Sequence, residues 1–134
     1  MTRNAPPPGI GTLGDERFVS LTTFRRTGEP VATPVWVARD GAHLLVTTPE
    51  GSGKVKRLRH TSRVELRPCS RTGKVEDDAP TTHGDAVIEP EDRPGVFRRK
   101  YGLEYRVFML VERLAARGGN KPRVLLRISP AAAA

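Results

Sequence analysis

Apolar and polar residues alternate along three runs in the first half of the chain, residues 18–25, 31–39 and 42–48. These runs are rich in β-branched and aromatic residues, and this composition predicts half-buried strands. Asp40 and Gly41 supply a tight turn between the second and third runs. The pattern therefore predicts an antiparallel meander of three strands. Pro34 requires an edge position or a bulge in the second strand, because proline lacks a ladder donor.

The pattern changes after residue 49, where strand alternation stops. Residues 54–60 are mostly good helix formers, and Ser52 is placed to be the N-cap of a short helix. Alternation returns in three further predicted strands, at residues 63–69, 82–89 and 123–128. The chain thus carries six predicted strands around one short helix.

Residues 91–117 are helical in character, with Pro94 near the first turn and Gly102 separating one helix from the next. Four apolar residues at helical spacing predict a core-facing stripe on the second helix: Val107, Leu110, Val111 and Leu114. The elements together predict a mainly β fold with α content (α+β). We expect a small barrel of six or more antiparallel strands with a short helix and a C-terminal helical segment.

The chain is expected to form one domain over residues 15–130. Residues 1–14 are predicted to be a disordered lead, because their prolines and glycines disfavour regular structure and little in them is apolar. Residues 131–134 form a short tail.

Composition excludes several classes of protein. No window in the 134 residues approaches the roughly 20 apolar residues that cross a bilayer, and residues 1–10 lack the apolar centre of a signal peptide, so a cytoplasmic location is expected. Cys69 is the single cysteine, which rules out an internal disulfide. His43, His60 and His83 lack zinc-ligand spacing, so no metal site is predicted.

The formal net charge of +8 favours an anionic partner. Residues 51–74 contain eight Lys and Arg residues opposed by Glu65 alone. One interpretation of this run is a solvated helix face. A second is a phosphate site, because Lys54 and Arg57 lie on one face of the short helix and Ser52 marks its N-terminus.

Four segments carry a family resemblance: LTTFRRTGEPVATPVWV (residues 21–37), VTT (46–48), PEGSGKVKRLR (49–59) and SRVELRPC (62–69). With them, the chain resembles the split β-barrel flavin and deazaflavin reductases, which are related to pyridoxamine phosphate oxidase. It is most similar to the mycobacterial-type branch that uses coenzyme F-420, an 8-hydroxy-5-deazaflavin. The resemblance implies a split β-barrel of the FMN-binding type.

The resemblance also implies a set of cofactor-binding residues. Ser52, Lys54 and Arg57 match the segment that binds the coenzyme's phosphate and the start of its oligoglutamate tail. The strand bordering the cofactor and the strand along its tricyclic ring supply the rest of the set: Thr47, Thr48, Thr33, Pro34, Val35 and Trp36. The alternative interpretation of Trp36 is an aromatic side chain that only packs in the core. FMN-binding relatives often carry a further basic residue beside the serine, where this chain has Gly53.

The implied function is that of an oxidoreductase that transfers a hydride from reduced F-420 to a small quinone-, tetrapyrrole- or nitroaromatic-like acceptor. A homodimer with the cofactor at its interface is implied as well. No residue is assigned a catalytic role, although Tyr101, Tyr105 and Arg106 are candidates to orient a substrate. The alternatives are an FMN-binding oxidoreductase, a non-catalytic deazaflavin carrier and, more distantly, a basic nucleic-acid-binding domain. The scarcity of aromatic residues argues against the last.

Overall fold

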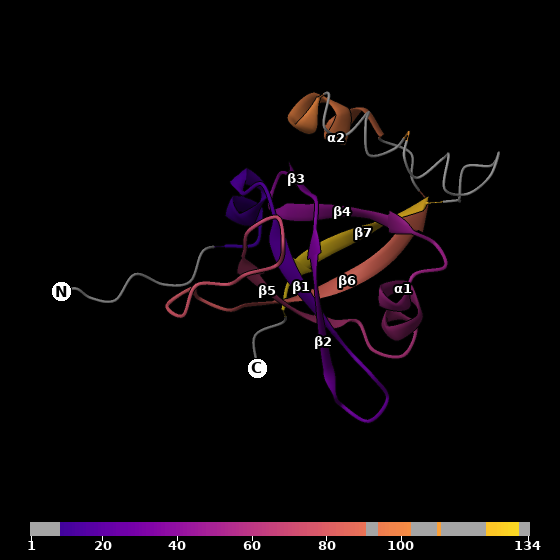
Figure 1. The fold of residues 1–134 in the computed structure, drawn as a ribbon. Helices are drawn as coiled ribbons and strands as arrows, with labels where there is room; N and C mark the ends of the chain where they lie inside the picture. The colour runs from indigo at the N-terminus through magenta and orange to yellow at the C-terminus, as the bar shows by residue number, and fades with distance from the viewer. Residues whose placement is uncertain (1–8, 91–93, 103–109, 111–122, 132–134) are drawn as a thin grey trace.

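The computed structural model describes residues 9–90, 94–102, 110 and 123–131, and within them a single curled sheet of seven antiparallel strands (Figure 1). The strand order is β2-β1-β5-β6-β7-β4-β3. This architecture confirms the predicted mainly β split barrel. The elements in chain order are η1 (Gly11–Asp15), β1 (Val19–Phe24), β2 (Pro30–Val35), β3 (Val37–Asp40), β4 (His43–Pro49), α1 (Gly53–Leu58), β5 (Arg63–Pro68), β6 (Thr82–Pro90), α2 (Pro94–Tyr101) and β7 (Arg123–Pro130).

The predicted three-strand meander is wrong. Residues 31–39 form two strands, which are interrupted at Trp36. β2 pairs with β1 and β3 pairs with β4, so one continuous stretch of chain supplies both edges of the sheet. Because only Trp36 separates β2 from β3, the two edges must approach each other, and the sheet curls into a barrel with a seam at this residue. Pro34 lies on an edge strand as predicted, and the break comes two residues later.

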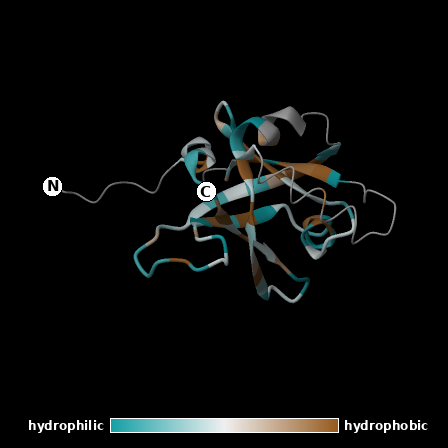
Figure 2. Ribbon diagram, turned by 45° about the horizontal axis from the view of Figure 1, so that its top comes forward, coloured by the Kyte–Doolittle hydropathy of each residue, from teal (hydrophilic) through white to brown (hydrophobic). Residues whose placement is uncertain are grey.

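The main core fills the inner face of the curled sheet. Leu21, Leu44, Leu66 and Ile128 are among its fully buried side chains, and they come from four different strands. Figure 2 shows hydrophobic stretches within the strands and hydrophilic residues on most of the connecting loops. Burial alternates along β2 and β5 as the sequence pattern predicts, whereas β1 and β4 are buried on both faces along most of their length.

A second, smaller apolar cluster lies on the outer face, where α2 packs. Phe97 and Tyr101 of α2 are buried against Ala38, Leu45 and Leu125 of the sheet. The helix begins at Pro94 as predicted. It is followed by Gly102 in the left-handed region, with φ of +54°, which a glycine adopts without strain.

Residues 9–14 correct the predicted disordered lead. Ile10 and Leu13 are buried in the main core, and η1 begins at Gly11. A Cβ at Gly14 would lie 2.6 Å from the Cβ of Arg39, and one at Gly11 would lie 2.8 Å from the carbonyl oxygen of Gly41. These glycines permit close packing of η1 on β3, a role that composition alone does not distinguish from disorder.

Part of the prediction lies outside the described residues, namely residues 1–8 and most of the second C-terminal helix. Leu110 is the one described member of the apolar stripe, and it is 54% exposed, so the core-facing prediction is wrong for this residue. None of the helices in the described ranges has the length and hydrophobicity that a membrane span requires.

Candidate functional site

The site is built around the start of α1, just after the end of β4. Ser52 is the N-cap, as predicted: its Oγ accepts a hydrogen bond from the backbone N–H of Val55 at 3.5 Å and lies 3.2 Å from the Oγ1 of Thr48. Val55 and Leu58 are buried and anchor this six-residue helix to the barrel. The apolar anchors and the cap together fix the direction in which the basic residues of α1 project.

Arg57 reaches from α1 to the neighbouring strand β1. Its Nε donates a hydrogen bond to Oγ1 of the fully buried Thr23 at 2.6 Å. Its guanidinium also lies against Gly53, where an added Cβ would come within 2.8 Å of Nη1. Arg57 therefore occupies the space that a larger residue at position 53 would need.

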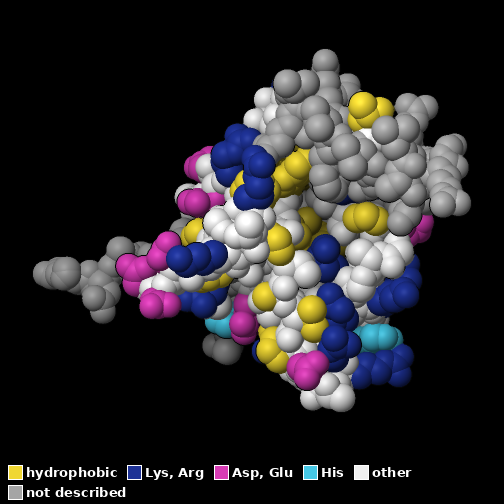
Figure 3. All heavy atoms as spheres, viewed as in Figure 1, with side chains coloured by type: hydrophobic (Ala, Val, Ile, Leu, Met, Phe, Trp, Pro, Cys, Tyr) yellow, Lys and Arg dark blue, Asp and Glu magenta, His cyan; other side chains and the backbone are white. Residues whose placement is uncertain are grey.

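Lys54 is half-buried beside two other cations. Burial lowers the pKa of its ammonium from the ordinary 10.5, and the charges of Arg57 and Arg123 lower this pKa further. No ion pair joins Lys54 or Arg57 to a carboxylate within the described part of the chain. Figure 3 shows Lys and Arg side chains gathered over α1 and the adjacent end of the β1–β2 hairpin. A cluster of cations that repel one another is suited to an anionic ligand.

Sequence reasoning missed the contribution of Arg123. The antiparallel pairing of β4 with β7 sets Arg123 opposite Pro49, at the end of β4 that leads into α1. Its Nε donates a hydrogen bond to Oγ1 of the buried Thr47 at 3.0 Å. No local motif could have indicated this residue, because its place in the site depends on strand pairing across more than half of the chain.

Thr47 and Thr48 serve opposite faces of the sheet. Thr48 lies on the inner face of the sheet, as does Val46 two residues earlier, which belongs to the main core. The hydroxyl of Thr48 contacts Ser52, the cap of α1. Thr47 lies on the outer face and holds Arg123. Thr48 therefore supports the cap of α1 and Thr47 supports Arg123, a consequence of the two-residue period of a strand.

The predicted residues Thr33, Pro34, Val35 and Trp36 lie on the β2 edge and at the seam. Thr33 stands opposite Leu21 in the ladder, on the same face as Thr23 one rung further on. The hydroxyl of Thr33 is buried without a hydrogen-bond partner among the described residues. A buried hydroxyl of this kind is normally satisfied, so a ligand group is a fitting partner for it. Val35, by contrast, belongs to the main core, and Pro34 is exposed.

Trp36 is half-buried and stacks on Tyr101, with the ring centroids 5.0 Å apart and the planes at 17°. The Tyr101 hydroxyl accepts the backbone N–H of Val37 at 3.0 Å and donates to the carbonyl oxygen of Arg17 at 2.8 Å. Tyr101 is therefore engaged with the backbone rather than directed at a substrate. Tyr105 and Arg106, the other candidates for substrate contact, lie outside the described residues.

Comparison with known proteins identifies the family. The family model for pyridoxamine 5'-phosphate oxidase matches residues 12–134. The chain belongs to the pyridoxamine 5'-phosphate oxidase family. The pyridoxamine 5'-phosphate oxidase fold binds flavin-type cofactors, and the family includes oxidoreductases. A search of curated proteins found no match to the chain.

Solved structures share the pyridoxamine 5'-phosphate oxidase fold at low sequence identity. An F-420 reductase has 21% identity and a TM-score of 0.56, over 95% of this chain and 97% of that one. An FAD-binding protein from Mesorhizobium loti has 19% identity and a TM-score of 0.56, over 90% and 85%. A heme storage protein from Vibrio cholerae has 13% identity and a TM-score of 0.59, over 89% and 84%. These similarities establish the fold.

Proposed function

We propose that this protein is an oxidoreductase that binds reduced coenzyme F-420 and transfers a hydride from it to a small organic acceptor. The observation that carries the proposal is the cluster of Lys54, Arg57 and Arg123 around the start of α1, in which each arginine is held by a buried threonine hydroxyl. Membership of the pyridoxamine 5'-phosphate oxidase family and the fold shared with an F-420 reductase support it.

The residues present fit a ligand with more than one negative charge. A bound phosphate would offset the repulsion that lowers the pKa of Lys54, and a nearby carboxylate of an oligoglutamate tail would engage a second cation. The buried hydroxyl of Thr33 offers one further polar group on the same sheet face as Thr23. The donor set thus matches a phosphate and a carboxylate chain better than a neutral ligand.

Gly53 favours F-420 over FMN. The family resemblance implies an additional basic residue beside the serine in many FMN-binding relatives, and here the guanidinium of Arg57 fills that space. The cations of this site are instead spread over α1 and β7. Such a spread suits an extended polyanion more than a single phosphate.

The protein's own part in the reaction is binding, orientation and exclusion of water. When bound, F-420 supplies the hydride, so the chain needs no nucleophile. The cations of α1 and β7 hold the anionic end of the coenzyme, and the seam residues border its ring in this proposal. We further propose a homodimer with the cofactor at its interface, in which Val87, 55% exposed on β6, is available for a contact.

Fluorescence titration with F-420 and with FMN tests the proposal. We expect tighter binding of F-420, and about ten-fold weaker binding of it by Lys54→Met and by Arg123→Gln, because each variant loses a charge-assisted contact. Lys56→Met is the matched control, since Lys56 lies on the same helix but is exposed. Equal or tighter binding of FMN would contradict the choice of cofactor. Unaltered F-420 affinity in both variants would place the anion site elsewhere, with Lys56 and Arg59 as the next pair.

Turnover is tested separately from binding. The reduced coenzyme is incubated with the protein and a panel of quinone, tetrapyrrole and nitroaromatic acceptors, and the return of the oxidised absorbance is followed. We expect at least one acceptor to restore it. Binding of F-420 without oxidation by any acceptor would favour a carrier over an enzyme.

A further inference from the structure

The last turn of α2 holds the seam of the barrel through two adjacent residues, Lys100 and Tyr101. We propose that these are positioning residues that set the ring of Trp36 at the seam, where it borders the cofactor ring. The placement of Trp36 is inferred from the contacts of α2 alone, whereas its role toward a ligand rests on the proposed function.

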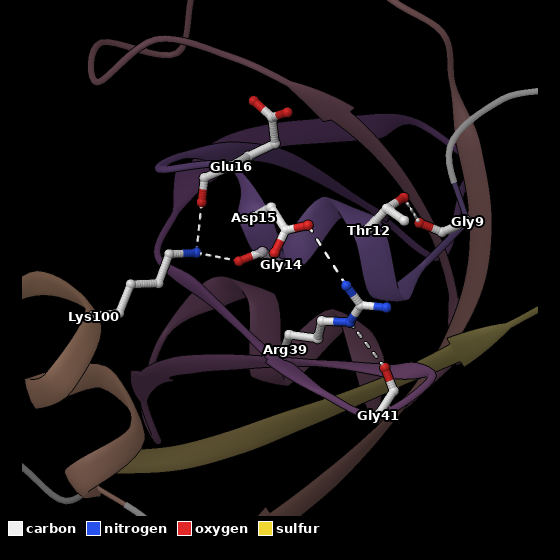
Figure 4. Close-up of polar contacts among 8 residues, drawn as sticks. All are labelled: Gly9, Thr12, Gly14, Asp15, Glu16, Arg39, Gly41 and Lys100. Carbon is white, nitrogen blue, oxygen red and sulfur yellow. Dashed lines mark hydrogen bonds and ion pairs between the residues drawn. The ribbon is translucent and has the colours of Figure 1, made fainter.

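Lys100 binds three backbone carbonyls from two segments, the end of η1 and the start of β3. Its Nζ donates hydrogen bonds to the carbonyl oxygens of Glu16 at 2.6 Å and Val37 at 2.9 Å, and to that of Gly14. Figure 4 shows the side chain reaching from α2 to the carbonyl oxygen of Gly14, within η1, and to that of Glu16, directly after η1. An ammonium has three N–H donors, and here each has a carbonyl acceptor. A methionine at this position would leave three backbone acceptors without that partner.

Tyr101 holds the same stretch of β3 from the next position. Its hydroxyl accepts the N–H of Val37, while the carbonyl oxygen of Val37 accepts from Lys100. Both polar groups of the first residue of β3 are therefore bound by α2. Val37 directly follows Trp36, so these contacts fix the backbone on one side of the tryptophan.

The ring of Tyr101 fixes the side chain of Trp36 as well. The two rings stack at 5.0 Å, and Trp36 also packs against the outer apolar cluster that α2 covers. The backbone contacts and the ring contact come from the same helical turn. Release of α2 would therefore free the backbone beside Trp36 and remove one face of its ring contact at once.

Intrinsic fluorescence reports the position of Trp36 directly, because it is the only tryptophan in the chain. In the cofactor-free protein we expect a red-shifted emission in Lys100→Met and in Tyr101→Leu, as the ring becomes more hydrated. Tyr101→Phe keeps the ring contact and loses the hydroxyl, so we expect a smaller shift. Lys74→Met is the control, since Lys74 is exposed on the loop between β5 and β6. Far-UV circular dichroism confirms that each variant is folded.

Emission equal to that of the parent in folded Lys100→Met or, if that variant does not fold, in folded Tyr101→Phe would overturn the proposal. For the ligand role, we expect Lys100→Met to weaken F-420 binding several-fold while inorganic pyrophosphate binding changes less than two-fold, because the cations around α1 are untouched. A shifted emission with unchanged F-420 affinity would overturn the ligand role. If the emission of the variants is shifted but the parent protein binds no F-420, the positioning of Trp36 is supported and the proposed function is refuted.

Discussion

At the scale of single residues, the site contains a charge that the fold itself does not favour. Lys54 is half-buried, and its burial and the charges of Arg57 and Arg123 all lower the pKa of its ammonium. A group held against its own electrostatic preference is typical of a binding site, because the ligand later supplies the missing countercharge. Stability and affinity should therefore respond in opposite directions to its removal.

Lys54→Met should raise the free energy of unfolding of the cofactor-free protein by roughly 0.5 to 1 kcal/mol, a figure that allows for partial solvent screening of the ammonium. The physical reason is the loss of repulsion and of a desolvation cost, with the apolar stem of the side chain retained. Urea denaturation of the parent, Lys54→Met and the exposed-site control Lys56→Met measures this difference. A destabilised Lys54→Met would show that the ammonium already has a favourable partner in the empty site.

The pH dependence of the same pair of proteins follows from the lowered pKa of Lys54. Above this lowered pKa and below the ordinary 10.5, the unfolded chain binds more protons at this residue than the folded chain does. The cost of Lys54 is therefore fully present below the lowered pKa and is relieved as the pH rises from there toward 10.5. We expect the stability advantage of Lys54→Met to shrink over that interval, as measured by urea denaturation at several alkaline pH values. If the stability advantage of Lys54→Met did not change with pH, it would not arise from the lowered pKa of Lys54.

At the scale of elements, close backbone approach holds η1 against β3 beside the main core, and a side chain of α2 binds the same segment. η1 packs on β3 without side chains at Gly11 and Gly14, and Lys100 binds the carbonyls around the end of η1. Arg39 adds a contact to Asp15 at 3.6 Å and one to the carbonyl oxygen of Gly41 at 3.3 Å, both visible in Figure 4. The segment is thus part of the domain rather than a lead before it.

Gly14→Ala should lower the free energy of unfolding by about 1 to 3 kcal/mol, since the new methyl group would overlap the backbone and Cβ of Arg39. Gly9→Ala is the matched control, because a Cβ at Gly9 meets nothing within 4 Å. Thermal and urea unfolding of the two variants measure the difference. Equal stability would mean that η1 contributes little to the folded domain.

At the scale of the whole molecule, the net charge of +8 attracts any polyanion, so charge alone does not define a ligand. The cations of the site combine partial burial with a shared position at the end of β4 that leads into α1. Buried or partly buried charges are screened less by salt than exposed ones are. Salt therefore separates a specific site from a general attraction.

F-420 binding should persist between about 50 and 200 mM salt, whereas any binding to DNA should be weak, independent of sequence and largely lost over that interval through counterion release. Parallel titrations with the coenzyme and a short duplex at several salt concentrations provide the measurement. Tight DNA binding that resists salt, without F-420 binding, would favour the nucleic-acid alternative.

Local patterns determined a large part of this protein. The two-residue alternation identified most of the strands, Ser52 marked the start of α1, and Gly102 marked the end of α2. The charge run placed Lys54 and Arg57 on one helix. Each of these features depends on residues within one or two turns of each other, and for that reason the linear sequence reveals them.

Tertiary structure alone decided the remaining features, because they depend on contacts between distant segments. Closure of the sheet divided the second predicted strand at Trp36 and carried its halves to opposite edges. Pairing of β4 with β7 brought Arg123 beside the α1 site, and packing of η1 required the glycines that composition associated with disorder. Strand register and close approach are set by the fit of the whole core, and no short stretch of sequence contains that information.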